Sequence, residues 1–210
     1  MSRIAFYTNP MSRGQIARWA LHEAGAEYDE IILGYGPEMK SIDYLAVNPM
    51  GKVPAIVHEG HAVSEAAAIC LYLADAFPGA GLQPDGLAEK ADFLRWTFFA
   101  AGPVEQAVVN RSMGWSPGDD LQLQGRLGYG SYERTVGVLS AIFETRDYVC
   151  GDRFTAADIY VGSQVDWGIQ FGTIPETPAL RDYAARLRER PAYKAAKAID
   201  GAHIARMQGG

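Results

Sequence analysis

Strand-forming patterns are confined to roughly the first third of this chain, and this constrains its fold more than any other feature. Short apolar runs alternate there with helical periodicity as far as residue 76. They give the order strand, helix, strand, helix, strand, strand, helix, and the last two strands meet at the turn-forming pair Glu59-Gly60. Beyond a proline- and glycine-rich segment at residues 77–84, the remaining patterns are helical. We therefore expect an α/β domain followed by an all-α domain.

The spacing of apolar residues and of turn signals gives the expected bounds of each element. In the first part, strands are expected at residues 4–7, 28–33, 53–57 and 61–63, and helices at 12–25, 39–46 and after residue 65. In the second part, helices are expected at about 87–113, 122–145, 155–170 and 178–200. These bounds predict a first domain at 1–78, a linker at 79–86 and a helical domain at 87–210.

Composition excludes several classes of partner. The formal net charge is −6, which argues against nucleic acid or an anionic membrane as the main partner. No apolar run approaches the ~18 residues that span a bilayer, and the start of the chain runs directly into a strand without a secretory signal. The two cysteines, Cys70 and Cys150, suggest no disulfide framework, so a reducing cytoplasm is expected. His58 and His61 flank a turn without a third ligand, so no metal site is expected.

One stretch of the first domain has the pattern of a peptide-binding site. Residues 48–56, Asn-Pro-Met-Gly-Lys-Val-Pro-Ala-Ile, form a turn and then a Val-Pro step that opens a strand. If the Val53–Pro54 bond is cis, Val53 turns its own N–H and C=O outward, where an extended peptide can pair with them. Glu65 then begins a helix beside free backbone N–H groups. This combination is typical of a receptor for a small charged peptide.

The stretches 48–56 and 65–69 closely resemble the glutathione-site motif of the cytosolic glutathione transferases, and the resemblance extends over nearly the whole chain. It implies a thioredoxin-like βαβαββα domain followed by an all-helical domain. It also implies an enzyme of detoxification that activates the thiol of glutathione, its co-substrate, for attack on a hydrophobic electrophile. A homodimer is implied as well.

The resemblance assigns glutathione contacts residue by residue. Val53 would bind the cysteinyl part through its backbone, next to a cis Pro54, and Glu65 with the N–H of Ala66 would hold the γ-glutamyl end. Ala66 departs from the family pattern, which has serine there, and the lost hydroxyl is expected to weaken binding by about 0.5–1.5 kcal/mol. Lys52 is a candidate for the glycyl carboxylate, and so is Lys40.

The chemistry of the family requires a hydrogen-bond donor to the bound thiolate at the start of the first helix. Ser12 is the first candidate, because it stands at the expected N-cap and resembles the catalytic serine of the serine-type classes. Tyr7 is the next candidate, and Thr8 and Asn9 remain open, as does a purely capping role for Ser12. Arg13 would add positive potential.

A pocket for the second substrate is expected between the domains. Its candidate lining residues are Trp96, Phe99, Met113 and Trp115. Aromatic residues at helical spacing also occur in cores, so packing remains the alternative. An apolar pocket would suit hydrophobic electrophiles, although the sequence does not name one.

A second motif is expected to serve folding. Thr155 and Asp158 have the spacing of a capping box at the start of a helix, and the family carries a similar motif at its core helix. Two alternatives to conjugation remain open: a non-catalytic glutathione-binding module, and a glutathione-dependent isomerase, peroxidase or dehalogenase.

Overall fold

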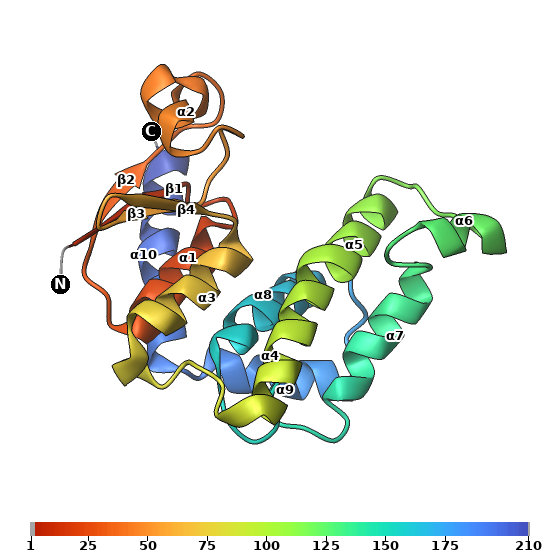
Figure 1. Cartoon of the computed structure of the whole chain (residues 1–210). Helices are drawn as coiled ribbons and strands as arrows, with labels where there is room; N and C mark the ends of the chain where they lie inside the picture. Colours follow the sequence, from red (N-terminus) through yellow and green to blue (C-terminus); the bar gives the residue numbers. More distant parts are fainter. Residues whose placement is uncertain (1–2, 210) are drawn as a thin grey trace. The chain divides into compact units, whose positions relative to one another are not determined.

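The computed structural model describes residues 3–209, which form two compact units. The first unit combines the chain up to Gln83 with the segment from Glu189 onward, and the second spans Pro84–Arg188. Figure 1 shows the sheet in the first unit and a purely helical second unit. The expected succession of an α/β part and an all-α part is confirmed.

A four-stranded mixed sheet forms the centre of the first unit. The strands β1 (Ile4–Thr8), β2 (Tyr28–Ile32), β3 (Ala55–His58) and β4 (His61–Ser64) lie in the order β2-β1-β3-β4. β1 and β2 are parallel, and the other two pairs are antiparallel. The helices α1 (Gly14–Ala24) and α3 (Ala66–Ala76) pack on one another on one face, and the short helices η1 (Glu38–Lys40) and α2 (Ile42–Val47) lie on the other (Figure 1).

The hairpin between β3 and β4 has the expected two-residue turn. His58 pairs with His61, and Glu59 and Gly60 both have positive φ angles, 51° and 82°. This geometry is that of a type I′ turn, whose twist matches the strands that it joins.

Seven helical segments make up the described part of the second unit. They are α4 (Gly86–Phe99), the π-helical η3 (Ala100–Val104), α5 (Glu105–Ser112), α6 (Leu121–Arg126), α7 (Tyr132–Ile142), α8 (Ala156–Gln170) and α9 (Pro178–Arg188). α8 is buried along most of its length. A Cβ atom built on its Gly162 would lie 2.1 Å from a methyl group of Leu187, so this glycine lets α9 approach closely.

Two of the expected helices are divided in the structure. The helix expected at 122–145 separates into α6 and α7, because residues 127–131 include Gly130 with a φ of 65°. The helix expected at 178–200 ends at Arg188, and a new helix, α10 (Pro191–Gln208), begins with a proline at its first position.

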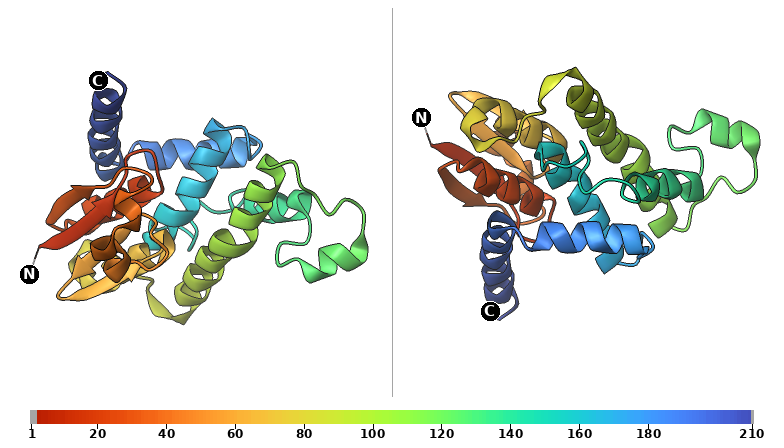
Figure 2. Two further views of the ribbon diagram at one scale, coloured as in Figure 1. Left: turned by 90° about the horizontal axis from the view of Figure 1, so that it is seen from above. Right: turned by 90° about the horizontal axis from the view of Figure 1, so that it is seen from below.

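The location of α10 corrects the expected domain boundary. Residues 189–210 were expected in the helical domain, but α10 packs along α1 in the first unit. Figure 2 shows the dark blue C-terminal helix beside the red N-terminal part of the same unit. The fully buried Arg18 of α1 bonds Asp200 of α10 at 2.9 Å, and the rings of Trp19 and Tyr193 meet edge to face. A helical pattern alone does not show which unit a helix packs against.

Candidate functional site

The sheet register brings three separate segments to one end of the first unit. Tyr7 at the end of β1 pairs with Ala55 at the start of β3, and Ala55 pairs with Ser64 at the end of β4. The turn after Thr8, the Val53–Pro54 step before β3 and Glu65 after β4 therefore lie at the same end of the sheet. These are the segments from which the sequence predicts a glutathione site.

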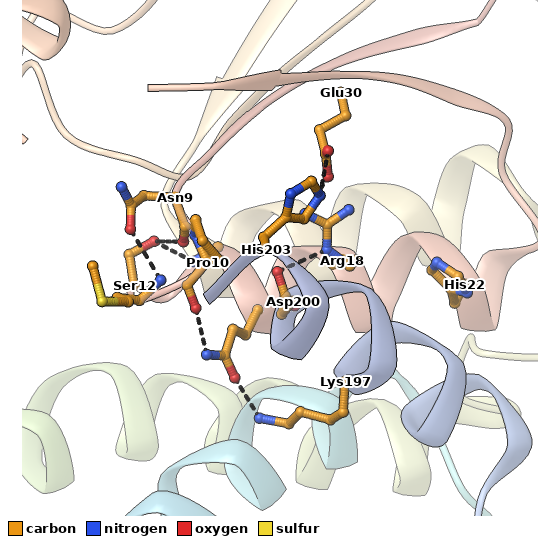
Figure 3. Close-up of polar contacts among 12 residues, drawn as sticks. Asn9, Pro10, Ser12, Arg18, His22, Glu30, Lys197, Asp200 and His203 are labelled. Carbon is orange, nitrogen blue, oxygen red and sulfur yellow. Dashed lines mark hydrogen bonds and ion pairs between the residues drawn. The ribbon is translucent and has the colours of Figure 1, made fainter. Parts of the chain in front are cut away.

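The turn between β1 and α1 is held by Asn9 and Ser12 (Figure 3). The Asn9 side chain donates from Nδ2 to the carbonyl of Leu33 at 2.8 Å and accepts the Met11 N–H at 2.9 Å. The Ser12 hydroxyl donates to the Asn9 carbonyl at 2.7 Å and accepts the Gly14 N–H at 2.9 Å. Asn9 thus shapes the turn, and Ser12 presents a hydroxyl two residues before the helix.

Ser12 is not the N-cap of α1. The helix begins at Gly14 and Arg13 occupies the N-cap position, because the Ser12 N–H bonds back to the Asn9 carbonyl at 3.1 Å and closes a turn first. Ser12 is half-buried and Arg13 is exposed. The role of Ser12 as donor to a thiolate stays a prediction.

Thr8 and Tyr7 point into packed surroundings. Thr8 is fully buried, and a Cβ atom built on Gly14 would lie 2.0 Å from its hydroxyl oxygen. Only glycine at position 14 allows the turn and the helix to approach this closely. The Tyr7 ring lies 5.3 Å from the ring of Tyr44, in an apolar cluster that also contains Val53.

The Val53–Pro54 peptide bond is cis, as the motif predicts. The preceding Lys52 carbonyl accepts two hydrogen bonds, from the Tyr44 hydroxyl at 2.6 Å and from Asn48 Nδ2 at 2.7 Å. Burial raises the pKa of Tyr44 to about 12, so this hydroxyl keeps its proton at neutral pH. The backbone before the cis bond is therefore fixed from two sides.

The two candidate lysines are used differently. Lys40 donates from Nζ to the carbonyls of Met50 at 2.9 Å and Gly51 at 3.0 Å, so its ammonium group supports the loop before the motif. Both side chains are exposed, but the Lys40 ammonium group is already engaged by the two carbonyls. A role of Lys52 at a ligand carboxylate stays a prediction.

Glu65 has an unusual backbone conformation at the start of α3. Its φ of 66° is rare for a residue with a side chain and costs about 1–3 kcal/mol, so the surrounding structure must impose it. It is exposed, and within residues 3–209 no side chain caps the first N–H groups of α3. The first turn continues with Ala66, Ala67 and Ala68, whose side chains have no polar group that could accept from its backbone donors.

The four candidates for the second-substrate pocket lie in the second unit, in two different settings. Trp96 is buried in α4, in edge-to-face contact with Phe99 at 5.6 Å, and donates to Asp92 at 3.2 Å. Met113 at the end of α5 is 78% exposed, and Trp115 beyond it is 43% exposed. Trp96 thus serves packing, and a shared pocket for the four residues stays a prediction.

Sequence reasoning missed the residues that support the site. Tyr44 and Asn48 fix the Lys52 carbonyl, and Gln15 donates to the Pro10 carbonyl at 2.6 Å. Asn48 belongs to the recognised motif at residues 48–56, so the sequence indicated that it lies near the site but not that it supports the Lys52 carbonyl. Tyr44 and Gln15 stand in ordinary amphipathic helices, and nothing in the sequence separates them from surface residues.

Two further kinds of feature are missing from the described part of the chain. None of its helices combines the length and apolarity that crossing a membrane requires. No three histidine, cysteine, aspartate or glutamate side chains between residues 3 and 209 gather in the arrangement of a metal site.

The structure thus belongs to the class of two-part proteins that join a thioredoxin-like sheet unit to a helical unit. Two family models match the chain: the glutathione S-transferase N-terminal domain over residues 11–76 and the C-terminal domain over residues 131–191. This chain belongs to the glutathione S-transferase family. The family and the fold expected from the sequence are thereby confirmed.

Individual relatives agree with this assignment. The glutathione S-transferase GST-4.5 of Xanthomonas campestris pv. campestris is 32% identical over 150 residues, which cover 64% of this chain and 68% of the relative. A glutathione transferase structure from Methylococcus capsulatus superposes with a TM-score of 0.77 at 27% identity, covering 94% of this chain and 98% of the other. A sphingomonad glutathione S-transferase complexed with glutathione gives 0.75 at 28% identity, with coverages of 94% and 98%.

Proposed function

We propose that this protein is a glutathione transferase that binds glutathione at one end of its sheet and activates the thiol for attack on a hydrophobic electrophile. One observation carries the proposal. The strand register places the Ser12 turn, the cis Val53–Pro54 step and the uncapped start of α3 at the same end of the sheet.

The residues have complementary roles in this proposal. The Val53 backbone pairs with the cysteinyl part of glutathione. The hydrogen bond that holds the preceding Lys52 carbonyl helps to orient this backbone. Glu65 binds the α-ammonium group of the γ-glutamyl residue, and the N–H of Ala66 binds its carboxylate. The Lys52 side chain meets the glycyl carboxylate, and Arg13 adds positive potential at the start of α1.

The chemical step requires a thiolate. A free thiol has a pKa of about 8.5, so most of it is protonated at neutral pH. A hydrogen bond from the Ser12 hydroxyl, together with the positive end of α1, favours the thiolate, and the thiol proton passes to solvent. The sulfur then donates its electron pair to the electrophilic carbon, a C–S bond forms, and the leaving group departs with the electrons of the bond that breaks.

The remaining expectations from the sequence are part of the same proposal. The second unit supplies apolar contacts to the electrophile, and the exposed Met113 and Trp115 are the leading candidates. The enzyme acts in the cytoplasm as a homodimer and contributes to detoxification.

A calorimetric titration with glutathione, run on the wild type and on Ser12→Ala, tests the proposal. We expect micromolar to low-millimolar binding by both proteins, and a bound thiol whose pKa is higher in the variant. Conjugation of chlorodinitrobenzene should fall with the thiolate fraction. Absence of glutathione binding by the wild type would refute the proposal.

Two other results would redirect it. Binding with an equal thiol pKa in both proteins would transfer the donor role to Tyr7 or Asn9. Binding with no activity on electrophiles, peroxides or isomerisable substrates would identify a non-catalytic binding module.

A further inference from the structure

The last helix of the first unit reaches the turn that carries Ser12. α10 lies along α1 and is anchored there by two polar pairs: the buried Arg18 bonds the buried Asp200 at 2.9 Å, and the half-buried His203 lies 2.7 Å from a carboxylate oxygen of Glu30 in β2. Arg18 is fully buried and Asp200 is 1% exposed. The position of α10 along α1 is therefore well defined.

A chain of two hydrogen bonds leads from this anchored helix to the turn (Figure 3). Lys197 of α10 donates from Nζ to Oε1 of Gln15 at 2.6 Å, and Gln15 donates from Nε2 to the carbonyl of Pro10 at 2.6 Å. Lys197 and Gln15 are half-buried and Pro10 is buried. The donor direction is fixed, because the ammonium group has no lone pair and the amide presents one oxygen and one NH₂ group.

The Pro10 carbonyl, at which the two hydrogen bonds end, belongs to the turn that carries Ser12. Asn9 holds the turn on the β2 side through the Leu33 carbonyl, and Gln15 holds the Pro10 carbonyl on the α10 side. The Ser12 hydroxyl donates to the Asn9 carbonyl at 2.7 Å, and to serve a thiolate it must redirect this one proton. The distance from the hydroxyl to the sulfur then depends on where both supports hold the turn.

We propose that Lys197 and Gln15 are positioning residues for the thiol-activating turn, so that α10 sets the geometry of the Ser12 hydrogen bond. This inference rests on the proposed function. The two residues do not touch glutathione. They act through the Pro10 carbonyl, and a displacement of about 1 Å at a reacting group can lower a rate by as much as ~100-fold.

The test uses the full chain and four variants. Lys197→Met and Gln15→Met break the two hydrogen bonds separately. Lys197→Arg keeps a cationic donor, and Lys194→Met is the matched control, because Lys194 lies in the same helix but pairs with the exposed Glu189 at 2.6 Å. For each protein we would measure the glutathione Kd, the pKa of the bound thiol from thiolate absorbance, the kcat with chlorodinitrobenzene, and the Tm.

We expect both breaking variants to bind glutathione within about threefold of the wild type, with a bound-thiol pKa higher by about half a unit or more and kcat lower by about tenfold. Lys197→Arg and Lys194→Met should match the wild type in thiol pKa and kcat. A purely structural role would lower the Tm without moving the thiol pKa.

Three results would overturn the inference. Lys197→Met and Gln15→Met could both leave the thiol pKa and kcat unchanged, which would refute positioning while the proposed function stands. Lys194→Met could change the thiol pKa as much as Lys197→Met, which would show a nonspecific charge effect. A wild type that does not lower the pKa of bound glutathione would refute the positioning role together with the proposed activation.

Discussion

The helices α8 and α3 begin in opposite ways. At the start of α8, the Asp158 carboxylate is fully buried and accepts hydrogen bonds from the Thr155 N–H at 2.8 Å and the Val149 N–H at 2.7 Å. The expected capping box is confirmed there. At the start of α3, Glu65 is exposed with a φ of 66°, and in the described structure no side chain caps the first turn.

The difference shows two uses of the same backbone chemistry. Every helix begins with N–H groups that lack partners within the helix. At α8 the chain satisfies them internally, and Asp158 also accepts from the Tyr183 hydroxyl at 3.0 Å, which joins α8 to α9. At α3 the donors stay available at the sheet end where the glutathione site is proposed. The start of α8 is thus closed by its own side chains, and the start of α3 is open, which the proposed function assigns to glutathione.

The largest effect on stability is expected from removing the Asp158 carboxylate at the start of α8. Asp158→Ala leaves two buried N–H groups and the Tyr183 hydroxyl without their acceptor, so the free energy of unfolding should fall by about 3–5 kcal/mol in urea denaturation. Glu65→Ala should change it by about 0.5 kcal/mol or less. Equal losses in the two variants would contradict the division between folding and binding.

The proposed role of the start of α3 is tested by measuring the glutathione affinity of Glu65→Ala. Glu65→Ala should lower the affinity for glutathione by about 10- to 100-fold in calorimetry, because a charge-assisted hydrogen bond is lost. Glu59→Ala is the matched control: Glu59 is also an exposed glutamate with positive φ, and it lies in the β3–β4 turn, at the opposite end of the sheet. Equal affinities of wild type and Glu65→Ala would exclude Glu65 from the site.

Burial of Asp158 gives the closed start a pH dependence. Burial raises the pKa of Asp158 to about 6, above its value in the unfolded chain, so the folded state binds the extra proton between about pH 4 and pH 6. The contribution of this carboxyl to stability is therefore greatest below pH 4 and is lost as the pH rises through 6.

The measurement compares the wild type with Asp158→Asn, which cannot titrate at this position. The stability advantage of the wild type should shrink by about 1–3 kcal/mol between pH 4 and pH 7. An advantage that grows with pH would show that the hydrogen bonds outweigh burial and hold the pKa of Asp158 below its ordinary value.

The smallest effect on glutathione affinity is expected at Ala66, the first residue of α3. Ala66→Ser restores the hydroxyl that the family pattern has at this position, and the added hydrogen bond should raise glutathione affinity by about 2- to 10-fold. Ala67→Ser, one position further along α3, should leave the affinity unchanged. A gain in both variants would point to an effect on α3 itself.

Local patterns predicted much of this structure, and long-range contacts account for most of what they missed. The Glu59-Gly60 turn and the Thr155–Asp158 capping box depend on residues at most three positions apart, so the sequence displays them directly. The docking of α10 depends on a pair 182 positions apart, Arg18 and Asp200, which no periodicity reveals.

The candidate site divides in the same way. The motif residues Val53, Pro54 and Glu65 were recognised as a linear pattern, and the structure places them at one end of the sheet with the Ser12 turn. The N-cap position of Ser12 was predicted wrongly, because the competing turn is stabilised by the Asn9 side chain and its contact with Leu33, 24 positions away. Gln15 and Lys197 became visible only through their contacts.

The attachment of α10 to the first unit also affects the order in which the two units can finish folding during synthesis. Arg18 is made before the second unit, whereas Asp200 emerges after the whole of it. Domains generally fold in the order of their synthesis. Here Arg18 of α1 can pair early with Glu30 of β2, but its second carboxylate partner, Asp200, arrives only with the late helix α10. The second unit, contained within Pro84–Arg188, can complete its folding first. The sheet of the first unit is translated before the second unit, yet it gains its last helix only after that unit has been made.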